Sequence, residues 1–435
     1  MQNRIQTWLD VCEANPNTGE VKKLMRESSP AWVDVIIEPK WLANGDFLWM
    51  SDKADGRRHV YRISADGQTS LALTEGDWDV ADILWHDESG ESLIVQGNYG
   101  NPIETHAFRV EAKSKKLTRL TKEVGTHRCD VDPSGQYFMD RHSNIDAPSR
   151  LDLKKTDGAL VRTLSATTID RFKFMAARPP LLTTIKARDG MDLQAMVIAP
   201  PGLDLSNPDK KYPVLFHVYG GPQNSTIANK FQEGNYWWHQ YLAQQGYVVM
   251  LCDNRASRGP GGRDTWPIHR NLGEVELRDL EDAAKWVAAQ PWGDENRIGV
   301  WGWSYGGYFT GYALTHSKLF KVGISGAPVT DWRNYDAVYT ERYMDTPQNN
   351  PDGYKKSSVV EAAKNLHGSL LLIHGEIDDN VHMSNTLQLA YALQKAGKPF
   401  ELMIYPRNRH GIVDPAQRRH MHEMMTDFLE RNLKQ

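Results

Sequence analysis

The residues of this 435-residue chain that are best placed to do chemistry lie at Gly302–Gly306, which reads Gly-Trp-Ser-Tyr-Gly. Gly-x-Ser-x-Gly is the spacing of a nucleophile elbow, a tight strand-to-helix turn that exposes a serine hydroxyl. Glycine is favoured on both sides because backbone and a neighbouring strand crowd the turn. An apolar run, 298–301, precedes Ser304, and a helix-compatible segment, 308–314, follows it. The sequence therefore predicts that Ser304 is a nucleophile.

Two loops further along the chain offer the partners that a serine nucleophile needs. A serine reacts poorly until a histidine takes its proton and a carboxylate orients that histidine. Asp378 follows the apolar run 370–374, and His410 follows the run 402–405. Open α/β sheets place their ligands at the carboxyl ends of strands, and the chain order Ser, Asp, His is that of α/β-hydrolases. We expect Asp378 and His410 to complete a catalytic triad with Ser304.

The elements that would position this triad alternate between strand and helix patterns. Six apolar runs are separated by helix-compatible segments: 213–218, 247–252, 298–301, 322–325, 370–374 and 402–405. The segment 274–289 reads as a helix with one apolar face, formed by Leu277, Leu280, Ala284 and Val287. Continuous apolar strands alternating with helices imply a parallel sheet that is covered on both faces. We predict an α/β-hydrolase domain with a mostly parallel, doubly wound sheet.

The N-terminal part of the chain repeats itself instead. Turns that end in Gly45, Gly90 and Gly135 recur every 45 residues, and each is followed by two strand-like runs separated by a polar loop. About four short strands in a repeat of this length are typical of a propeller blade. An unrelated β-meander is the alternative, and the regular spacing of the glycines favours the propeller. Residues 5–24 resemble only the outer half of a blade, so we expect about three and a half blades.

The predicted propeller is incomplete, because closed propellers usually have four to eight blades. An open array exposes a sheet edge and an inter-blade face. We therefore expect either an N-terminally shortened version of a longer protein or a partner that completes the ring. Pro179–Pro180 ends the blade pattern, and a hairpin that turns at Arg188–Gly190 follows. The predicted domains are a partial all-β propeller at 1–170, a connector with the first hairpin at 171–195, and the α/β-hydrolase catalytic domain at 196–435.

Composition and charge limit the classes of partner. The net charge is -4, with both signs interspersed, so we expect neither nucleic acid nor an anionic membrane surface to bind. No apolar run approaches the ~20 residues of a membrane span. The first twenty residues also lack the apolar core of a signal peptide. Cys12, Cys129 and Cys252 form neither a metal-binding pattern nor a disulfide framework, and we expect three buried thiols.

Four motifs together give the chain a specific resemblance to a known family. They are Val218–Pro222, the elbow through Tyr308, Tyr335–Met344 and His374–His382. With them the chain resembles the dipeptidyl peptidase IV branch of the prolyl oligopeptidase family of serine peptidases. The resemblance covers nearly the whole chain and is strongest from residue 210 onward. It implies an α/β-hydrolase domain capped by a β-propeller, in agreement with both halves of the pattern.

The resemblance also implies roles for single residues. Tyr219 matches the tyrosine whose hydroxyl joins the backbone N–H of Tyr305 in the oxyanion hole. Asn380 matches an asparagine that holds a substrate carbonyl. The residues that match a proline pocket are Val329, Trp332, Tyr335, Tyr339 and Val381. The spacing of 332, 335 and 339 would place three aromatic rings on one face of a helix. Without the resemblance, these rings would be interpreted as core more readily than as a pocket, Tyr219 as a buried structural tyrosine, and Asn380 as a loop cap.

Two features depart from the family pattern. Its members bind the free amino group of the substrate through two adjacent glutamates in the propeller, and no Glu-Glu pair occurs in this chain. Near Trp32, where an aromatic and a basic residue can stand in the family, this chain has Val35, Ile36 and Ile37. Recognition of a free N-terminus is therefore implied by the resemblance alone.

The predicted function is a serine peptidase that acts on peptides with penultimate proline or alanine, releases N-terminal dipeptides and needs no metal or cofactor. One alternative is a broader peptidase or esterase of the same fold. Another is a truncated, non-catalytic binding protein that carries the propeller. A homodimer is left open. The resemblance suggests a periplasmic or secreted protein, with any signal upstream of Met1.

Overall fold

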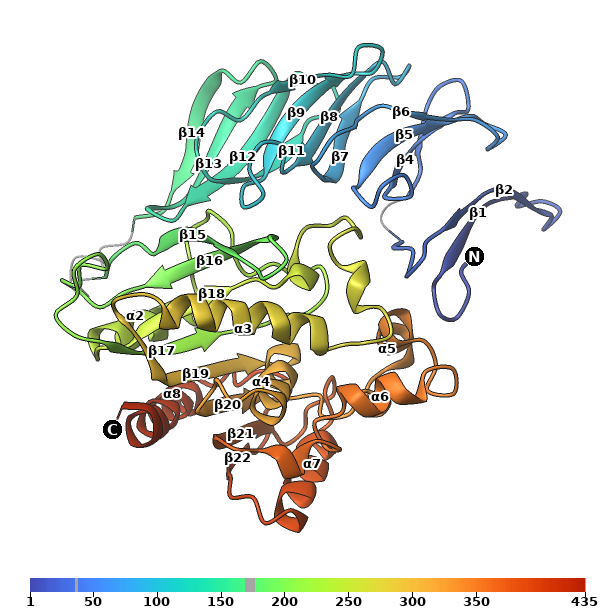
Figure 1. The fold of residues 1–435 in the computed structure, drawn as a ribbon. Coiled ribbons are helices and arrows are strands. Elements are labelled where there is room, and N and C mark those ends of the chain that lie inside the picture. Colours follow the sequence, from blue (N-terminus) through green and yellow to red (C-terminus); the bar gives the residue numbers. More distant parts are fainter. Residues whose placement is uncertain (36–37, 169–176, 435) are drawn as a thin grey trace. The chain divides into compact units, whose positions relative to one another are not determined.

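The computed structural model describes residues 1–35, 38–168 and 177–434, and they form two compact units. The N-terminal unit holds the described part of residues 1–174 together with two later segments, 228–232 and 259–266. The C-terminal unit holds the other described residues. The predicted boundary at 170 and the first six residues of the predicted connector lie outside the described residues. Figure 1 shows the elements of both units.

Antiparallel sheets make up the described part of the N-terminal unit. A two-stranded sheet pairs β1 (Trp8–Ala14) with β2 (Val21–Ser28). Three four-stranded sheets follow, which we call blades 1 to 3. Blade 1 consists of β3 (Lys40–Trp41), β4 (Phe47–Ser51), β5 (His59–Ile63) and β6 (Ser70–Ala72). Blade 2 consists of β7 (Val80–His86), β8 (Ser92–Gly97), β9 (His106–Glu111) and β10 (Lys116–Arg119). Blade 3 consists of β11 (Thr126–Val131), β12 (Tyr137–Asn144), β13 (Ala147–Lys155) and β14 (Leu160–Ala166). These sheets confirm the predicted partial β-propeller.

The repeating glycines end the turn between the first and second strands of each blade. Gly45, Gly90 and Gly135 have φ of 87°, 70° and 69°, a region that side chains with a Cβ atom rarely adopt. Two of them also lie against the preceding blade. A Cβ atom would come within 2.7 Å of Leu42 at Gly90 and within 2.5 Å of the Trp85 ring at Gly135. The glycine spacing therefore reflects both the turn and the stacking of blades.

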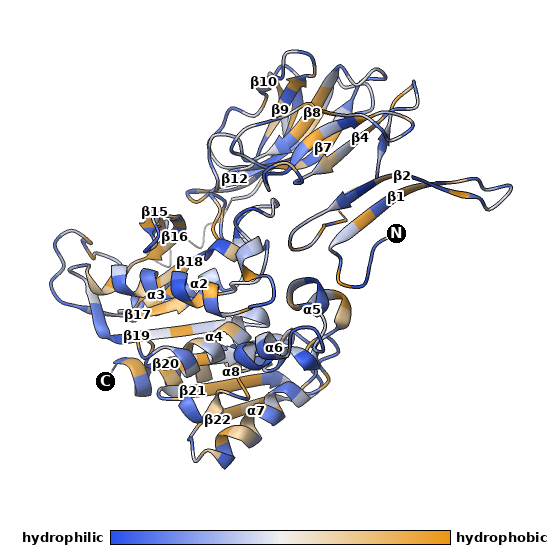
Figure 2. Ribbon diagram, turned by 45° about the vertical axis from the view of Figure 1, so that its right-hand side comes forward, coloured by the Kyte–Doolittle hydropathy of each residue, from blue (hydrophilic) through white to orange (hydrophobic). Residues whose placement is uncertain are grey.

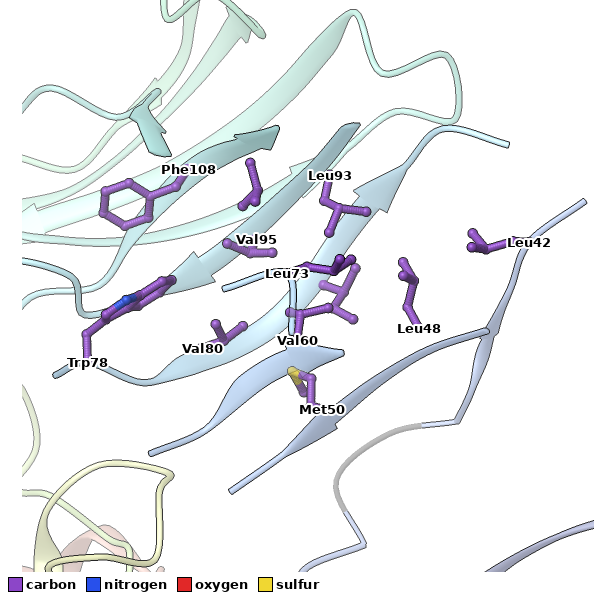
Figure 3. Packing of buried hydrophobic residues seen from close by; sticks show 12 residues of the cluster. Leu42, Leu48, Met50, Val60, Leu73, Trp78, Val80, Leu93, Val95 and Phe108 are labelled. Carbon is purple, nitrogen blue, oxygen red and sulfur yellow. The ribbon is translucent and has the colours of Figure 1, made fainter. Parts of the chain in front are cut away.

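Each sheet of this unit buries apolar side chains against the next. Met50 of blade 1 and Val80 of blade 2 belong to one buried cluster, which Figure 3 shows from close by. Ile94 of blade 2 and Phe138 of blade 3 belong to another. The two-stranded sheet contributes Leu9 to a third cluster, shared with blade 1. The core of the N-terminal unit is therefore a series of layers between sheets.

Hydrogen bonds explain why a segment from far along the chain belongs to the N-terminal unit. The buried side chain of Asn229 donates from Nδ2 to Glu104 Oε1 over 2.7 Å. Its backbone N–H donates to the carbonyl of Ile103 over 2.8 Å. The backbone N–H of Ile145 donates in turn to Asn229 Oδ1 over 3.2 Å. The sequence did not predict this association, because Asn229 has no local pattern that points to blades 2 and 3.

The described part of the C-terminal unit is built on one eight-stranded sheet, in the order β15-β16-β18-β17-β19-β20-β21-β22. The strands are β15 (Leu181–Lys186), β16 (Asp192–Ile198), β17 (Tyr212–His217), β18 (Val248–Cys252), β19 (Gly293–Trp303), β20 (Val322–Gly326), β21 (Ser369–Gly375) and β22 (Glu401–Tyr405). β15 and β16 form the predicted antiparallel hairpin, and the strands from β18 to β22 in the sheet pair in parallel. This sheet confirms the predicted α/β-hydrolase fold class.

Helices connect the strands of this sheet, and one more helix follows the last strand. They are α2 (Tyr236–Gln244), α3 (Glu274–Ala288), α4 (Tyr305–His316), α5 (Ala337–Met344), α6 (Pro351–Ser357), α7 (Ser384–Lys395) and α8 (Pro415–Leu429). The predicted apolar face of α3 is buried, including Leu280 and Val287. Figure 2 shows hydrophobic residues along strands of the sheet and mixed hydropathy along the helices. In the part of the chain that the structure describes, no helix has the length and apolar character to span a membrane.

The three cysteines are free thiols, and their burial differs from the prediction at one position. Cys129 and Cys252 are buried as expected, but Cys12 is only half-buried. Cys12 lies on β1, whose sheet has two strands, so fewer neighbours are available to cover it. The prediction of three buried thiols is therefore wrong for Cys12.

Candidate active site

Ser304 lies at the corner between β19 and α4, with φ of 62° and ψ of -120°. This strained backbone is expected to cost on the order of 1–3 kcal/mol and is typical of functional sites. The two flanking glycines are required by crowding. A Cβ atom at Gly302 or Gly306 would lie 2.3 or 2.2 Å from the carbonyl oxygen of Val218. The Gly-x-Ser-x-Gly spacing is therefore set by the close approach of the chain at Val218.

The structure brings the three predicted triad residues into one hydrogen-bonded chain. His410 Nε2 lies 2.9 Å from Ser304 Oγ, and His410 Nδ1 lies 2.8 Å from Asp378 Oδ2. In the tautomer that suits this geometry, Nδ1–H donates to the carboxylate and Nε2 accepts from the serine hydroxyl. This arrangement can remove the hydroxyl proton as the oxygen attacks an electrophile.

Asp378 is held as a carboxylate by several donors. Its side chain is fully buried, and the backbone N–H groups of Asn380 and Val381 donate to Oδ1 over 2.9 and 3.0 Å. Burial alone would raise the pKa of Asp378, but hydrogen bonds from His374, His410 and the Asn380 backbone together hold that pKa well below its ordinary value. Asp378 therefore stays ionised beside His410 at neutral pH.

His374 is a residue of this site that sequence reasoning missed. It is the second-last residue of β21 and is fully buried, with Nε2 3.3 Å from Asp378 Oδ2 and 2.8 Å from the carbonyl of Val381. Its Nδ1 lies 2.7 Å from Thr386 Oγ1. The imidazole of His374 thus contacts the Asp378 carboxylate in addition to the imidazole of His410. Two signals in the sequence were available: His374 is a polar residue near the end of an apolar run, and it begins the His374–His382 motif.

The loop that carries His410 is fixed by two contacts. Trp303, next to the nucleophile, donates from Nε1 to the carbonyl of His410 over 2.6 Å. Gly375 allows the loop to approach β21, because a Cβ atom there would lie 2.2 Å from the carbonyl oxygen of Arg409. These contacts explain why glycine follows His374 and why tryptophan precedes Ser304.

Tyr219 and Tyr305, the predicted oxyanion donors, lie with their ring centroids 6.1 Å apart. Tyr305 is the first residue of α4, so its backbone N–H has no carbonyl partner within the helix. Burial raises the pKa of Tyr219, against the opposing effect of a hydrogen bond with Asn224. The Tyr219 hydroxyl therefore stays protonated at neutral pH and can donate a hydrogen bond.

The predicted proline-pocket rings contact one another and Tyr305, and we call these four residues the aromatic cluster. Ring centroids are 5.4 Å apart for Tyr305 and Trp332, 6.0 Å for Trp332 and Tyr339, and 5.4 Å for Tyr335 and Tyr339. The Tyr335 hydroxyl donates to Asn380 Oδ1 over 2.7 Å. This bond links the aromatic cluster to the loop that carries Asp378.

The prediction that residues 332, 335 and 339 share one helix is wrong. Trp332 lies in a 3₁₀ turn, Trp332–Asn334, and Tyr339 lies in α5. Each element begins at its own aspartate cap: the side chain of Asp331 accepts from Arg333 N at the start of the turn, and that of Asp336 accepts from Tyr339 N at the start of α5. The rings still meet, because tertiary packing brings the two short elements together.

The remaining predicted residues have the following places. Val329 and Val381 are buried, with 2% and 0% exposure. Trp32 is buried and Val35 is exposed, whereas Ile36 and Ile37 lie outside the described residues. A cavity of about 960 Å³ is lined by α2 and α8, and none of the predicted site residues lines it.

One group among the described residues has the atoms of a metal site. Ligand atoms of Glu123, His127 and Asp140 lie within 4.8 Å of one another. However, the ammonium of Lys154 lies 2.7 Å from Glu123 and 2.9 Å from Asp140. Lys154 therefore already supplies the positive charge that these carboxylates need.

Comparison with known proteins agrees with both units. Residues 234–435 match the sequence profile of the prolyl oligopeptidase family, and residues 1–149 match that of the dipeptidyl peptidase IV N-terminal region. The chain therefore belongs to the prolyl oligopeptidase family, an α/β-hydrolase domain preceded here by a partial β-propeller. Within that family it belongs to the dipeptidyl peptidase IV branch.

Similar proteins fall in the same branch. Dipeptidyl peptidase 8 of Mus musculus is 32% identical, over 89% of this chain and 48% of the mouse protein. Dipeptidyl peptidase 4 of Trichophyton tonsurans is 31% identical, over 91% of this chain and 52% of its own length. The crystal structure of Porphyromonas gingivalis dipeptidyl peptidase 4 superposes with a TM-score of 0.93 at 34% identity, over 99% of this chain and 61% of that chain. The chain thus spans about half the length of the first two proteins.

Proposed function

We propose that this chain is a serine peptidase that cleaves after proline or alanine and releases N-terminal dipeptides. The observation that carries the proposal is the hydrogen-bonded chain Ser304–His410–Asp378, with the serine on a strained corner at the start of α4. The dipeptidyl peptidases similar to this chain support the class of substrate.

In the proposed reaction, Ser304 Oγ attacks the carbonyl carbon after the penultimate residue while His410 Nε2 takes the hydroxyl proton. Asp378 orients His410 and stabilises the imidazolium that forms. The Tyr219 hydroxyl and the Tyr305 N–H would donate to the developing oxyanion. His410 then gives its proton to the leaving amine, and water releases the dipeptide from the serine ester by the same steps in reverse order.

The aromatic cluster supports the proposed preference for proline. A pyrrolidine ring offers apolar surface and no N–H donor, so aromatic rings suit it better than polar groups do. Asn380 would hold a substrate carbonyl through its side-chain amide. Its Oδ1 accepts from Tyr335, which leaves the Nδ2–H groups pointing elsewhere as donors.

The test compares the wild-type chain with the S304A variant on Gly-Pro p-nitroanilide. We expect the variant to lose on the order of 10⁴-fold in turnover, because the triad acts as a unit. A fluorophosphonate probe should label the wild type and not S304A. Labelling without cleavage of the proline substrate would favour a broader esterase, and absence of labelling would favour a binding protein. If the wild type cleaved an N-acetylated substrate as fast as the free-amine substrate, the chain would still be a peptidase, but the assignment as a dipeptidyl peptidase would be wrong.

A further inference from the structure

Glu276 is a buried carboxyl group that the proposed reaction does not use. It lies in the first turn of α3, with 0% of its surface exposed. Among the described residues no cation pairs with it. A buried charge without an opposite charge is costly unless hydrogen bonds satisfy it, so its two partners define what it does.

Both partners of Glu276 are donors. Oε1 accepts from the hydroxyl of Tyr305 over 2.8 Å, and Oε2 accepts from the backbone N–H of Gly273 over 3.0 Å. Gly273 cannot be replaced there easily. It has φ of 98°, and a Cβ atom would lie 2.5 Å from the Tyr308 hydroxyl. One carboxyl group therefore joins the start of α3 to the start of α4.

Tyr305 occupies the centre of the proposed site. It follows the nucleophile directly, and its ring contacts Trp332 at 5.4 Å and Tyr219 at 6.1 Å between centroids. Tyr305 thus belongs to the aromatic cluster and also contacts the proposed oxyanion tyrosine. The Tyr305 hydroxyl donates to Glu276, so this bond fixes the hydroxyl end of the ring.

We propose that Glu276 is a positioning residue that, by accepting from the Tyr305 hydroxyl, holds the Tyr305 ring against Trp332 and so determines selectivity for proline. The inference rests on the proposed function. It assigns Glu276 no contact with the substrate. Glu276 affects catalysis only through Tyr305. Replacing Glu276 should therefore lower the cleavage of proline substrates more than the reactivity of Ser304.

The Glu276→Gln variant tests this proposal with little change of shape. A glutamine can accept one hydrogen bond through its oxygen, but its NH₂ group then meets a second donor, so one of the two bonds is lost. We expect kcat/KM for Gly-Pro p-nitroanilide to fall about tenfold, which corresponds to ~1.4 kcal/mol. The hydrolysis of p-nitrophenyl acetate and the rate of fluorophosphonate labelling should fall by much less.

Two further variants make the result decisive. Tyr305→Phe removes only the hydroxyl, so it should shift the proline-to-acetate ratio as Glu276→Gln does, and the double variant should show no additional shift. If Glu276→Gln fails to fold, Tyr305→Phe alone decides. Glu274→Gln is the matched control, because Glu274 is an exposed carboxylate in the same helical turn. It should leave the ratio unchanged.

The outcomes separate this inference from the proposed function. Equal losses on proline and acetate substrates in both variants would show that Glu276 is only structural, and unchanged selectivity would also overturn the proposal. A wild-type chain that is labelled but cleaves no proline substrate would overturn the proposed function, and this inference with it. A wild type with proline activity lost in S304A and unchanged in Glu276→Gln and Tyr305→Phe would overturn the inference alone.

Discussion

At the scale of single residues, the site depends on how one carboxylate is surrounded. Asp378 accepts from two backbone N–H groups and lies beside two imidazoles, those of His374 and His410. These donors all favour the ionised form. The charge of Asp378 is therefore available to stabilise His410 when that imidazole takes a proton.

We expect Asp378→Asn to lower turnover on Gly-Pro p-nitroanilide on the order of 10⁴-fold, because an amide NH₂ favours the wrong tautomer of His410. The measurement is kcat for variant and wild type at neutral pH. Asp379→Asn is the control, because Asp379 is an exposed neighbour that pairs with Arg409. A loss of less than tenfold in Asp378→Asn would show that Asp378 does not orient His410.

At the scale of elements, a hydrogen bond joins the first turns of α3 and α4 beside the nucleophile. The side chain that joins them, Glu276, has a pKa raised to about 7 by burial, although hydrogen bonds from the backbone and from Tyr305 act in the opposite direction. Asp279 on α3 adds to the increase, and the phenols that face Glu276 from α4 are those of Tyr305, Tyr308 and Tyr312. This junction should therefore respond to pH.

Ionisation of Glu276 should lower the free energy of unfolding of the wild-type chain as the pH rises from about 4.5 to 7. Because the pKa in the folded state lies above the ordinary value of 4.5, the folded chain binds the proton more tightly than the unfolded chain does. The resulting stabilisation is fully present below the ordinary pKa and is lost as the pH rises through about 7, on the order of 3 kcal/mol in all.

Thermal unfolding of the wild type and of Glu276→Gln across this pH range measures the effect. The Tm of the wild type minus that of Glu276→Gln should decrease as the pH rises. The Tm of Glu274→Gln should change with pH as that of the wild type does. A constant difference between pH 5 and 8 would show that Glu276 does not titrate in this range.

At the scale of the whole molecule, chain order and compact units do not coincide. Residues 228–232 and 259–266 lie in sequence within the α/β half, but they belong to the N-terminal unit. Asn229 forms part of this association through its bond to the buried carboxylate of Glu104. The N-terminal unit therefore depends on residues well beyond the blades.

Replacing Asn229 by Ala should destabilise the N-terminal unit locally by about 1–3 kcal/mol, because a buried carboxylate oxygen loses its donor. Hydrogen exchange of the β9 amides next to Glu104 should accelerate correspondingly. Lys230→Ala is the matched control, since Lys230 is exposed in the same segment. Unchanged exchange in Asn229→Ala would show that the bond contributes nothing to this unit.

What the sequence by itself determined is local in origin. The glycines beside Ser304 and in the blade turns follow from steric limits on neighbouring backbone, so their spacing predicted the elbow and the propeller. Apolar runs predicted the strands because burial on both sides of a parallel sheet requires them. Chain order then placed Asp378 and His410 on loops after strands, and the structure brings both to Ser304.

Only the tertiary structure decided contacts between residues that are distant in sequence. Glu276 and Tyr305 are 29 positions apart, and Asn229 and Glu104 are 125 apart. Neither pair lies on a shared helix face or strand register, so no periodicity could indicate it. The three pocket rings were predicted on one helix, but the N-caps Asp331 and Asp336 each begin a separate short element. Local steric limits depend on residues that are neighbours in sequence, whereas the partners of buried polar groups depend on how the whole chain packs.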